Sequence, residues 1–219
     1  MTEVVAFVPM KLNNERLPGK NTRRFSDGTM LFEKILAQLL STSRIGSIYV
    51  YCSNSDVAEL LPAGVKFLKR DTRLDQSTTS MNEVALAFAT TVPADCYVLA
   101  HATAPFLSSA SISLAVHSVI EGAHDSAFTV IRRSEFTWHD GRPTNYNPAN
   151  IPRTQDLPET YAETSGVYVY ERDLMVRENR RIGHTPALIE VSRIEALDID
   201  DADDFALANA VNIGLNAVS

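Results

Sequence analysis

The chain of 219 residues is long enough for one α/β domain with a well-covered core. Hydrophobic residues make up 45% and charged residues 21%, as in an ordinary soluble globular protein. The formal net charge of -7 argues against a nucleic-acid binder, whose surface would be basic. It still leaves room for a local basic loop that binds a small anion.

The first residues and the two cysteines predict neither export nor a membrane-spanning segment. The first residues, MTEVVAFVPM, lack a basic segment before their short apolar run, so they predict a strand and not a signal peptide. No apolar run approaches the roughly 20 residues that a membrane span needs. Cys52 and Cys96 lie in apolar runs without the spacing of a zinc site or a disulfide framework. We therefore expect buried free thiols and a reducing, cytoplasmic location.

Apolar runs that predict strands alternate with segments of helical spacing along the first part of the chain. In chain order we expect a strand at 4–8, a helix at 31–40, a strand at 48–52, a short helix at 56–61, a strand at 65–68, a helix at 82–90, a strand at 96–100, a helix at 109–121 and a strand at 127–131. This alternation predicts a mainly parallel sheet with helices on both faces. Strands that are apolar throughout agree, since a central parallel strand is buried on both sides.

The pattern breaks between Arg132 and Glu163, a polar stretch that is rich in Pro and Asn and carries the only tryptophan, Trp138. It is too long for an ordinary connection, so a lid, a dimer arm or a small subdomain are the alternatives. Regular elements then return, with strands at 166–170 and 186–191, a helix at 172–178, and a last helix whose inner side holds Phe205, Ala206, Ala208 and Val211. We expect a single domain over residues 1–219, with 132–163 as its arm or lid.

The loop after the first strand, KLNNERLPGKNTRR, is strongly basic. Its cations are Lys11, Arg16, Lys20, Arg23 and Arg24. Such a cluster repels itself unless an anion lies among the charges, and a triphosphate is a natural partner because Lys and Arg both bind phosphate. The alternative is a solvated basic surface. The Walker pattern GxxxxGK[ST] is absent.

Near the other end, LDIDDADDF concentrates aspartates in a short run. If residues 197–199 are extended, Asp198 and Asp200 point to the same side and suit Mg²⁺, which takes one or two carboxylates together with substrate phosphates. The aspartates at 201–204 are expected to cap the last helix, and capping of the whole run is the alternative. A cationic cradle and a carboxylate metal site on one sheet predict phosphoryl or nucleotidyl chemistry.

Five segments resemble, in order and over nearly the whole chain, the motifs of the acylneuraminate cytidylyltransferases, the CMP-sialic acid synthetases and their relatives. They are FVPMKLNNERLPGKN, KRDTRLDQSTTS, HATAPF, PRTQDLPETYAETSGVYVY and DIDDADDF. The resemblance implies a Rossmann-like, doubly wound α/β sheet of the nucleotide-diphospho-sugar transferase type. It further implies CTP as donor, Mg²⁺ as cofactor, pyrophosphate as product, and a homodimer in which the stretch 132–163 reaches the neighbouring subunit.

The resemblance also assigns roles to single residues. The cations expected at the phosphates are Lys11, Arg16 and Lys20. Asn21 and Arg70 are expected to bind the nucleotide, Ser80 the base, and Asp198 and Asp200 the Mg²⁺, with Lys11, Lys20 and the two aspartates as the catalytic set. His101 and Thr103 face the acceptor, with Arg153 and Gln155 near them.

Departures from the family motifs gather on the acceptor side. Lys11 replaces an arginine and Glu15 a common lysine, but His101 replaces a glutamine and Ser165 an asparagine. The residues of the nucleotide half match the family motifs more closely than those of the acceptor half. We therefore expect transfer of CMP from CTP to a small anionic acceptor. That acceptor is a sialic-acid-like sugar acid, or a phosphonate or phosphorylated small molecule. His101 is a candidate general base, since histidine titrates near neutral pH, or else a structural hydrogen-bonding residue.

Three other functions are weighed against transfer. The changed acceptor side permits a non-catalytic nucleotide-binding module on the same fold. A nicotinamide-dependent oxidoreductase ranks low because no GxGxxG follows the first strand. A glycosyltransferase would usually carry its Asp-x-Asp in mid-chain, whereas here that pattern is C-terminal.

Overall fold

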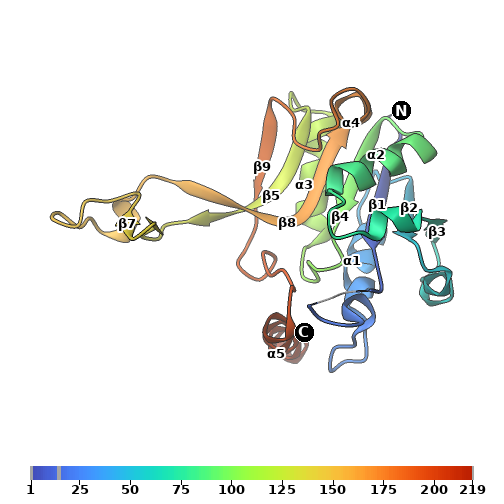
Figure 1. Cartoon of the computed structure of the whole chain (residues 1–219), viewed down its shortest axis with the longest axis horizontal. Helices are drawn as coiled ribbons and strands as arrows, with labels where there is room; N and C mark the ends of the chain where they lie inside the picture. Colours follow the sequence, from blue (N-terminus) through green and yellow to red (C-terminus); the bar gives the residue numbers. More distant parts are fainter. Residues whose placement is uncertain (1, 14–15, 219) are drawn as a thin grey trace.

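The computed structural model describes residues 2–13 and 16–218 and is built on one seven-stranded sheet. In spatial order the sheet runs β3-β2-β1-β4-β8-β5-β9 (Figure 1). Its strands are β1 (Val4–Met10), β2 (Ser47–Cys52), β3 (Val65–Lys69), β4 (Cys96–Ala100), β5 (Ser126–Arg133), β8 (Thr160–Glu171) and β9 (Pro186–Glu190). The predicted α/β class with a mainly parallel sheet is confirmed.

One strand runs against the others. β8 pairs antiparallel with both β4 and β5, while the remaining neighbours in the sheet are parallel. It is also longer than the strand expected at 166–170, because its first residues continue beyond the body of the sheet and pair with residues 130–133 of β5.

Helices cover both faces of the sheet. They are α1 (Leu31–Leu40), α2 (Met81–Thr91), α3 (Ser109–Ile120), α4 (Arg172–Glu178) and α5 (Ala202–Val218), with the short 3-10 turns η1 (Lys20–Thr22), η2 (Ser55–Leu60), η3 (Thr72–Asp75) and η4 (Thr154–Asp156). α1 and α3 pack on one apolar layer, and α2 and α4 on the other. The expected helix at 56–61 is the 3-10 turn η2. Within the described chain no helix combines the length and apolar character needed to cross a membrane.

The layer under α2 and α4 is aromatic. Phe7 of β1 stacks on Phe88 of α2 with ring centroids 4.1 Å apart, and Tyr97 meets both Phe88 and Tyr170. Side chains alternate along each strand, so the neighbours of these residues fill the opposite layer. Both cysteines are buried and free, as expected.

Residues 134–159, between β5 and β8, form an arm that projects from one edge of the molecule (Figure 1). It holds the two-stranded pair β6 (Trp138–His139) and β7 (Arg142–Pro143). The rings of Phe136 and Trp138 gather around Tyr146, yet Trp138 stays 57% exposed. The irregular stretch expected at 132–163 is therefore an excursion from a single sheet.

The last helix, α5, packs beside the N-terminal loop and not on the sheet itself (Figure 1). Phe205 and Ala208 are buried there with Phe25 and Leu31. Ala206 was also predicted for the inner side of α5, but it is exposed, so that prediction was wrong. Its neighbour Phe205 points inward instead.

Candidate functional site

Polar segments follow β1, β3 and β4 at the carboxyl edge of the parallel strands. Lys11 comes directly after β1, Arg70 after β3 and His101 after β4. This is the edge at which open α/β sheets bind ligands. Four of the five shielded side-chain atoms that lack a hydrogen-bond partner among the described residues belong to Arg70, His101, Arg181 and Asp198. Because such atoms are rare in folded proteins, their concentration here marks a candidate binding site.

The basic loop and the acidic segment meet. The Lys20 side chain is buried, and its Nζ donates a hydrogen bond to the Ile199 carbonyl at 2.7 Å and lies 3.5 Å from the Asp200 carboxylate. Arg16 pairs with the same carboxylate at 3.0 Å. Arg23 instead lies over the Phe205 ring and Arg24 binds the Gly28 carbonyl. Of the five predicted cations, Arg16 and Lys20 therefore meet the acidic segment, whereas Arg23 and Arg24 do not.

The backbone of the loop is held by its own residues. Gly19 adopts φ 67, in the left-handed region, and begins η1. The buried Asn21 donates its side-chain amide to the Lys11 carbonyl at 2.9 Å, so it fixes the place of that lysine. Lys11 itself reaches the Asp75 carbonyl at 3.3 Å. Glu15 lies outside the described residues.

Arg70 and Ser80 occupy structured positions beside this loop. The Arg70 guanidinium is buried against the Asp75 carboxylate, which also accepts the Ser53 hydroxyl. Ser80 is the N-cap of α2 and forms a capping box with Glu83. Asp75 was not predicted from the sequence, because an aspartate in a polar turn carries no signal of its own.

Asp198 and Asp200 differ in their surroundings. Asp200 is paired with Arg16 and Lys20, whereas Asp198 keeps a shielded Oδ1 without a partner among the described residues. Burial raises the pKa of Asp198, a hydrogen bond from Thr103 offsets part of the rise, and the charge of Asp200 adds to it. The peptide N–H of Ile199 donates to the Thr103 carbonyl at 2.9 Å, which sets Asp198 beside the predicted acceptor residue.

This pair of carboxylates fits Mg²⁺. The described residues contain no group of three or more His, Cys, Asp or Glu that could enclose a metal. Mg²⁺ binds through one or two carboxylates and completes its shell with water and substrate phosphates, so two oxygen-donating side chains suffice. The unpartnered oxygen of Asp198 supplies the observation that favours a cation here.

The aspartates that follow form a helix cap, as expected. Asp201 accepts hydrogen bonds from the N–H groups of Asp203 and Asp204, and Asp204 in turn accepts from those of Asp200 and Asp201. This reciprocal arrangement satisfies the free N–H groups at the start of α5. It also fixes the backbone of Asp200.

His101 is held as a neutral ring. Its peptide N–H donates to the Gly166 carbonyl at 3.0 Å, and its ring Nε2 is shielded without a partner among the described residues. Burial and the nearby charges of Arg181 and Lys20 lower the pKa of His101 to about 4. A base of this strength is poorly matched to catalysis near neutral pH, which favours the structural alternative for His101 over the general-base role.

Two small residues of β8, Ser165 and Gly166, lie opposite His101 at an irregularity in the pairing with β5. Ser165 adopts φ 56, a left-handed conformation that asparagine tolerates better than most residues. At Gly166 a Cβ would lie 3.2 Å from the Thr129 hydroxyl, so a side chain would crowd the β5–β8 contact.

Arg153 and Gln155 are not brought to this edge within one chain. Both are exposed on η4 in the arm, where Arg153 pairs with Asp156 at 2.7 Å. The arm points away from the sheet (Figure 1).

Arg181 was not predicted from the sequence. It lies 4.5 Å over the Tyr168 ring, within electrostatic reach of His101. In the sequence its run RENRRIGH looks like a solvated surface.

The chain matches known proteins along almost all its length. A family model described as cytidylyltransferase matches residues 5–210. N-acylneuraminate cytidylyltransferase A of Danio rerio is 24% identical over 217 residues, covering 94% of this chain and 50% of the relative, so the chain spans about half the length of that protein. Post-translational flagellin modification protein B of Campylobacter coli is 22% identical over 227 residues, covering 94% of each chain.

Solved structures share the fold. CMP:2-keto-3-deoxy-manno-octonic acid synthetase, solved with CTP, superposes with a TM-score of 0.75 at 15% identity and covers 97% of this chain and 99% of its own. 4-Diphosphocytidyl-2C-methyl-D-erythritol synthase from Anaerococcus prevotii gives 0.71 at 10% identity and 96% of both chains. At such identities these matches show the fold alone. The family match, which covers nearly the whole chain, shows that this chain belongs to the cytidylyltransferase family.

Proposed function

We propose that this protein transfers CMP from CTP to a small anionic acceptor and releases pyrophosphate. The observation that carries the proposal is the meeting of Lys20 and Arg16 with Asp200 at the ligand-binding edge of the sheet. Asp198 lies beside them, and its Oδ1 has no partner among the described residues. Family membership supports CTP as the donor. The names of the relatives point to acceptors such as N-acylneuraminate or 2-keto-3-deoxy-manno-octonic acid.

In the proposed reaction an acceptor oxygen attacks the α-phosphorus of CTP in line. A new acceptor O–P bond forms, the bond from the α-phosphorus to the bridging oxygen breaks, and pyrophosphate leaves with that electron pair. The proton of the acceptor hydroxyl passes to solvent, since His101 is a weak base here. Positioning and charge neutralisation supply most of the catalysis in such reactions.

The residues of this chain divide that work. Lys11, Arg16 and Lys20 neutralise the charge that develops on the leaving pyrophosphate. Asp198 and Asp200 would hold Mg²⁺, which when bound supplies positive charge at the α-phosphate. By the resemblance, Ser80 would contact the base and Arg70 the nucleotide. Thr103 and His101 would face the acceptor.

We further infer a homodimer in which the arm contacts a second copy. The arm exposes Trp138 and Ile151 at 57% and 62%, and exposed apolar patches mark interaction surfaces. Arg153 and Gln155 lie on the same arm, so the second copy is the place where they could meet an acceptor.

The proposal is tested by a screen of ATP, GTP, CTP and UTP against N-acetylneuraminate, 3-deoxy-D-manno-octulosonate, 2-hydroxyethylphosphonate and 2C-methyl-D-erythritol 4-phosphate. We expect pyrophosphate release with CTP and at least one acceptor, with kcat/KM for CTP about tenfold or more above that for UTP. EDTA should abolish release and added Mg²⁺ should restore it. CTP binding by calorimetry without pyrophosphate release from any acceptor would instead support the non-catalytic nucleotide-binding module.

A further inference from the structure

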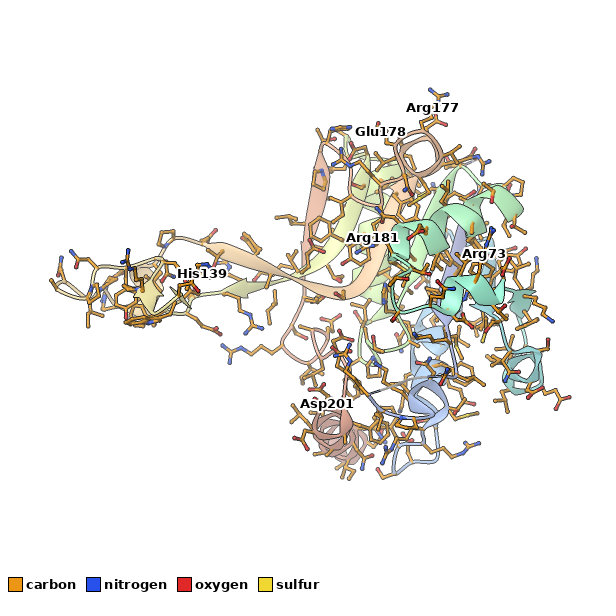
Figure 2. All side chains as sticks on the ribbon, in the orientation of Figure 1. Arg73, His139, Arg177, Glu178, Arg181 and Asp201 are labelled. Carbon is orange, nitrogen blue, oxygen red and sulfur yellow. The ribbon has the colours of Figure 1, made fainter. Side chains whose placement is uncertain are left out.

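Arg181 follows α4 and reaches back over the sheet. Its guanidinium lies 4.5 Å over the Tyr168 ring, and Nη1 donates to the Asn82 side-chain oxygen at 3.2 Å. Figure 2 places it between β8 and α2, on the aromatic face of the sheet. Stacking against Tyr168 holds the guanidinium plane and leaves its edges free for hydrogen bonds.

The second edge of this guanidinium has no partner. Nε is shielded from solvent and no described residue accepts a hydrogen bond from it or from Nη2. No carboxylate of the described chain pairs with Arg181, whereas Arg70 has Asp75. A partly buried cation without a counter-charge is unfavourable, and it is tolerated where a ligand completes it. The Nε and Nη2 donors form the fork that matches an oxyanion.

The surroundings place this edge on the acceptor side. The charge of Arg181 contributes to the lowered pKa of His101, so the two side chains are close. The ring of His101 lies 6.1 Å from the ring of Tyr168, and Tyr168 is the ring over which the guanidinium lies. The charge of Lys20 also lowers the pKa of His101. Lys20 in turn lies 3.5 Å from the Asp200 carboxylate, at the predicted phosphate subsite.

Neutral His101 complements the cation. A neutral imidazole adds no repulsion beside Arg181, and its unpartnered Nε2 can donate a second hydrogen bond when that nitrogen carries the proton. Arg181 and His101 both lie near the Tyr168 ring, and each carries a nitrogen without a partner that can donate a hydrogen bond to an anionic group.

We propose that Arg181, assisted by His101, binds an anionic group of the acceptor that is distinct from the oxygen that attacks CTP, and so selects hydroxy acids over neutral alcohols. This inference rests on the proposed transfer reaction. A carboxylate and a phosphonate share the required chemistry, and the probes below separate them.

Direct binding tests the proposal without turnover. The full-length protein is loaded with α,β-methylene-CTP and Mg²⁺ and titrated calorimetrically with N-acetylneuraminate, 3-deoxy-D-manno-octulosonate and 2-hydroxyethylphosphonate, and with the methyl ester of each sugar acid. We expect the wild type to bind at least one acid, and Arg181→Gln to bind it about tenfold or more weakly. Arg181→Lys should recover part of the loss, because it keeps the charge without the fork.

Controls separate acceptor binding from a structural role. Arg177→Gln removes the same charge from the outer face of α4, where Figure 2 shows Arg177 at the periphery, and should bind the acid like the wild type. The affinity of Arg181→Gln for the CTP analogue and its melting temperature should stay at wild-type values. The methyl ester should bind equally to the wild type and to Arg181→Gln.

Three results would overturn the proposal. One is equal binding of the acid by the wild type and Arg181→Gln. Another is a parallel loss of acid, ester and CTP-analogue affinity with a lower melting temperature, which would make Arg181 a clamp between α2 and β8. The third is a wild type that binds none of the anionic probes. Because no turnover is measured, failure of pyrophosphate release with these acids would count against the transfer reaction and not against the anion subsite.

Discussion

The carboxylate of Asp198 is placed for ligand binding at the expense of stability. Its pKa is raised mainly by burial, so its charged form is disfavoured in the fold, and one oxygen lacks a partner among the described residues. A carboxyl group with a raised folded-state pKa destabilises the fold at any pH above its unfolded value. Activity and stability therefore pull in opposite directions at this residue.

Asp198→Asn should lower pyrophosphate release about a hundredfold, because it removes a charged oxygen ligand. Its melting temperature should equal or exceed that of the wild type, because a neutral amide removes the desolvation penalty. Thermal unfolding and pyrophosphate release measure the two effects. Glu59→Gln, an exposed change on η2, is the control and should leave both unchanged. A variant that keeps full activity would refute the role of Asp198.

The site residues found from the sequence are those with local motifs. Lys20 and Asp200 stand in two charged runs that mark themselves by composition, and the structure brings them into contact. Arg181 and Asp75 could not be found in this way. Their importance comes from the residues they face, Tyr168 and Arg70, and those contacts exist only after the chain has folded.

The element α5 is attached to the N-terminal region through Asp27. That carboxylate accepts hydrogen bonds from Lys34 at 2.8 Å, Asn212 at 2.9 Å and Asn216 at 3.2 Å. Burial alone would raise the pKa of Asp27, but the hydrogen bonds from Lys34, Thr29 and Asn212 outweigh it and hold the pKa far below its usual range. The stabilisation is thus complete above the unfolded pKa of about 4 and is lost as the pH falls further.

Asp27→Asn should lower the stability by about 1–3 kcal/mol at pH 7, since an ionised acceptor of several hydrogen bonds becomes neutral. For a chain of this size, each kcal/mol corresponds to about 2–4 °C in melting temperature. Melting curves at pH 7, 5 and 3 should show a shallower acid dependence in the variant than in the wild type. Asp140→Asn, a change at an exposed turn of the arm, serves as control. Identical pH slopes in wild type and Asp27→Asn would contradict this account.

The direction and the length of β8 could not be predicted from the hydrophobic pattern. Residues 166–170 are apolar throughout, and burial on both faces gives that pattern whether a strand runs parallel or antiparallel. Residues 160–163 are mostly exposed where they leave the sheet with β5, so no hydrophobic pattern marks them. Helices α1 and α4, by contrast, begin and end where predicted, because their apolar spacing is local.

The molecule as a whole carries an arm with exposed apolar side chains, and we expect it to dimerise through that arm. Trp138→Ser combined with Ile151→Ser should give a monomer by light scattering under conditions where the wild type is a dimer. Since Trp138 is the only tryptophan, its emission should shift to longer wavelength as the wild type is diluted through dissociation.

A matched change elsewhere tests the specificity of that expectation. Leu207→Ser combined with Ile213→Ser removes two exposed apolar side chains from α5 and should leave the dimer intact. A wild type that is monomeric at all concentrations would refute the dimer. Dissociation by the α5 variant alone would place the interface there instead.

The hydrogen bond from Lys20 to the Ile199 carbonyl joins residues 179 positions apart. During synthesis the basic loop leaves the ribosome long before the carbonyl and the carboxylates that it faces. The chain therefore cannot hold a nucleotide in the proposed manner until the segment around Ile199 and Asp200 has been made. A ligand bound between the two segments would also stabilise the docking of α5 by mass action. Nucleotide binding would thus report the docking of α5 beside the basic loop.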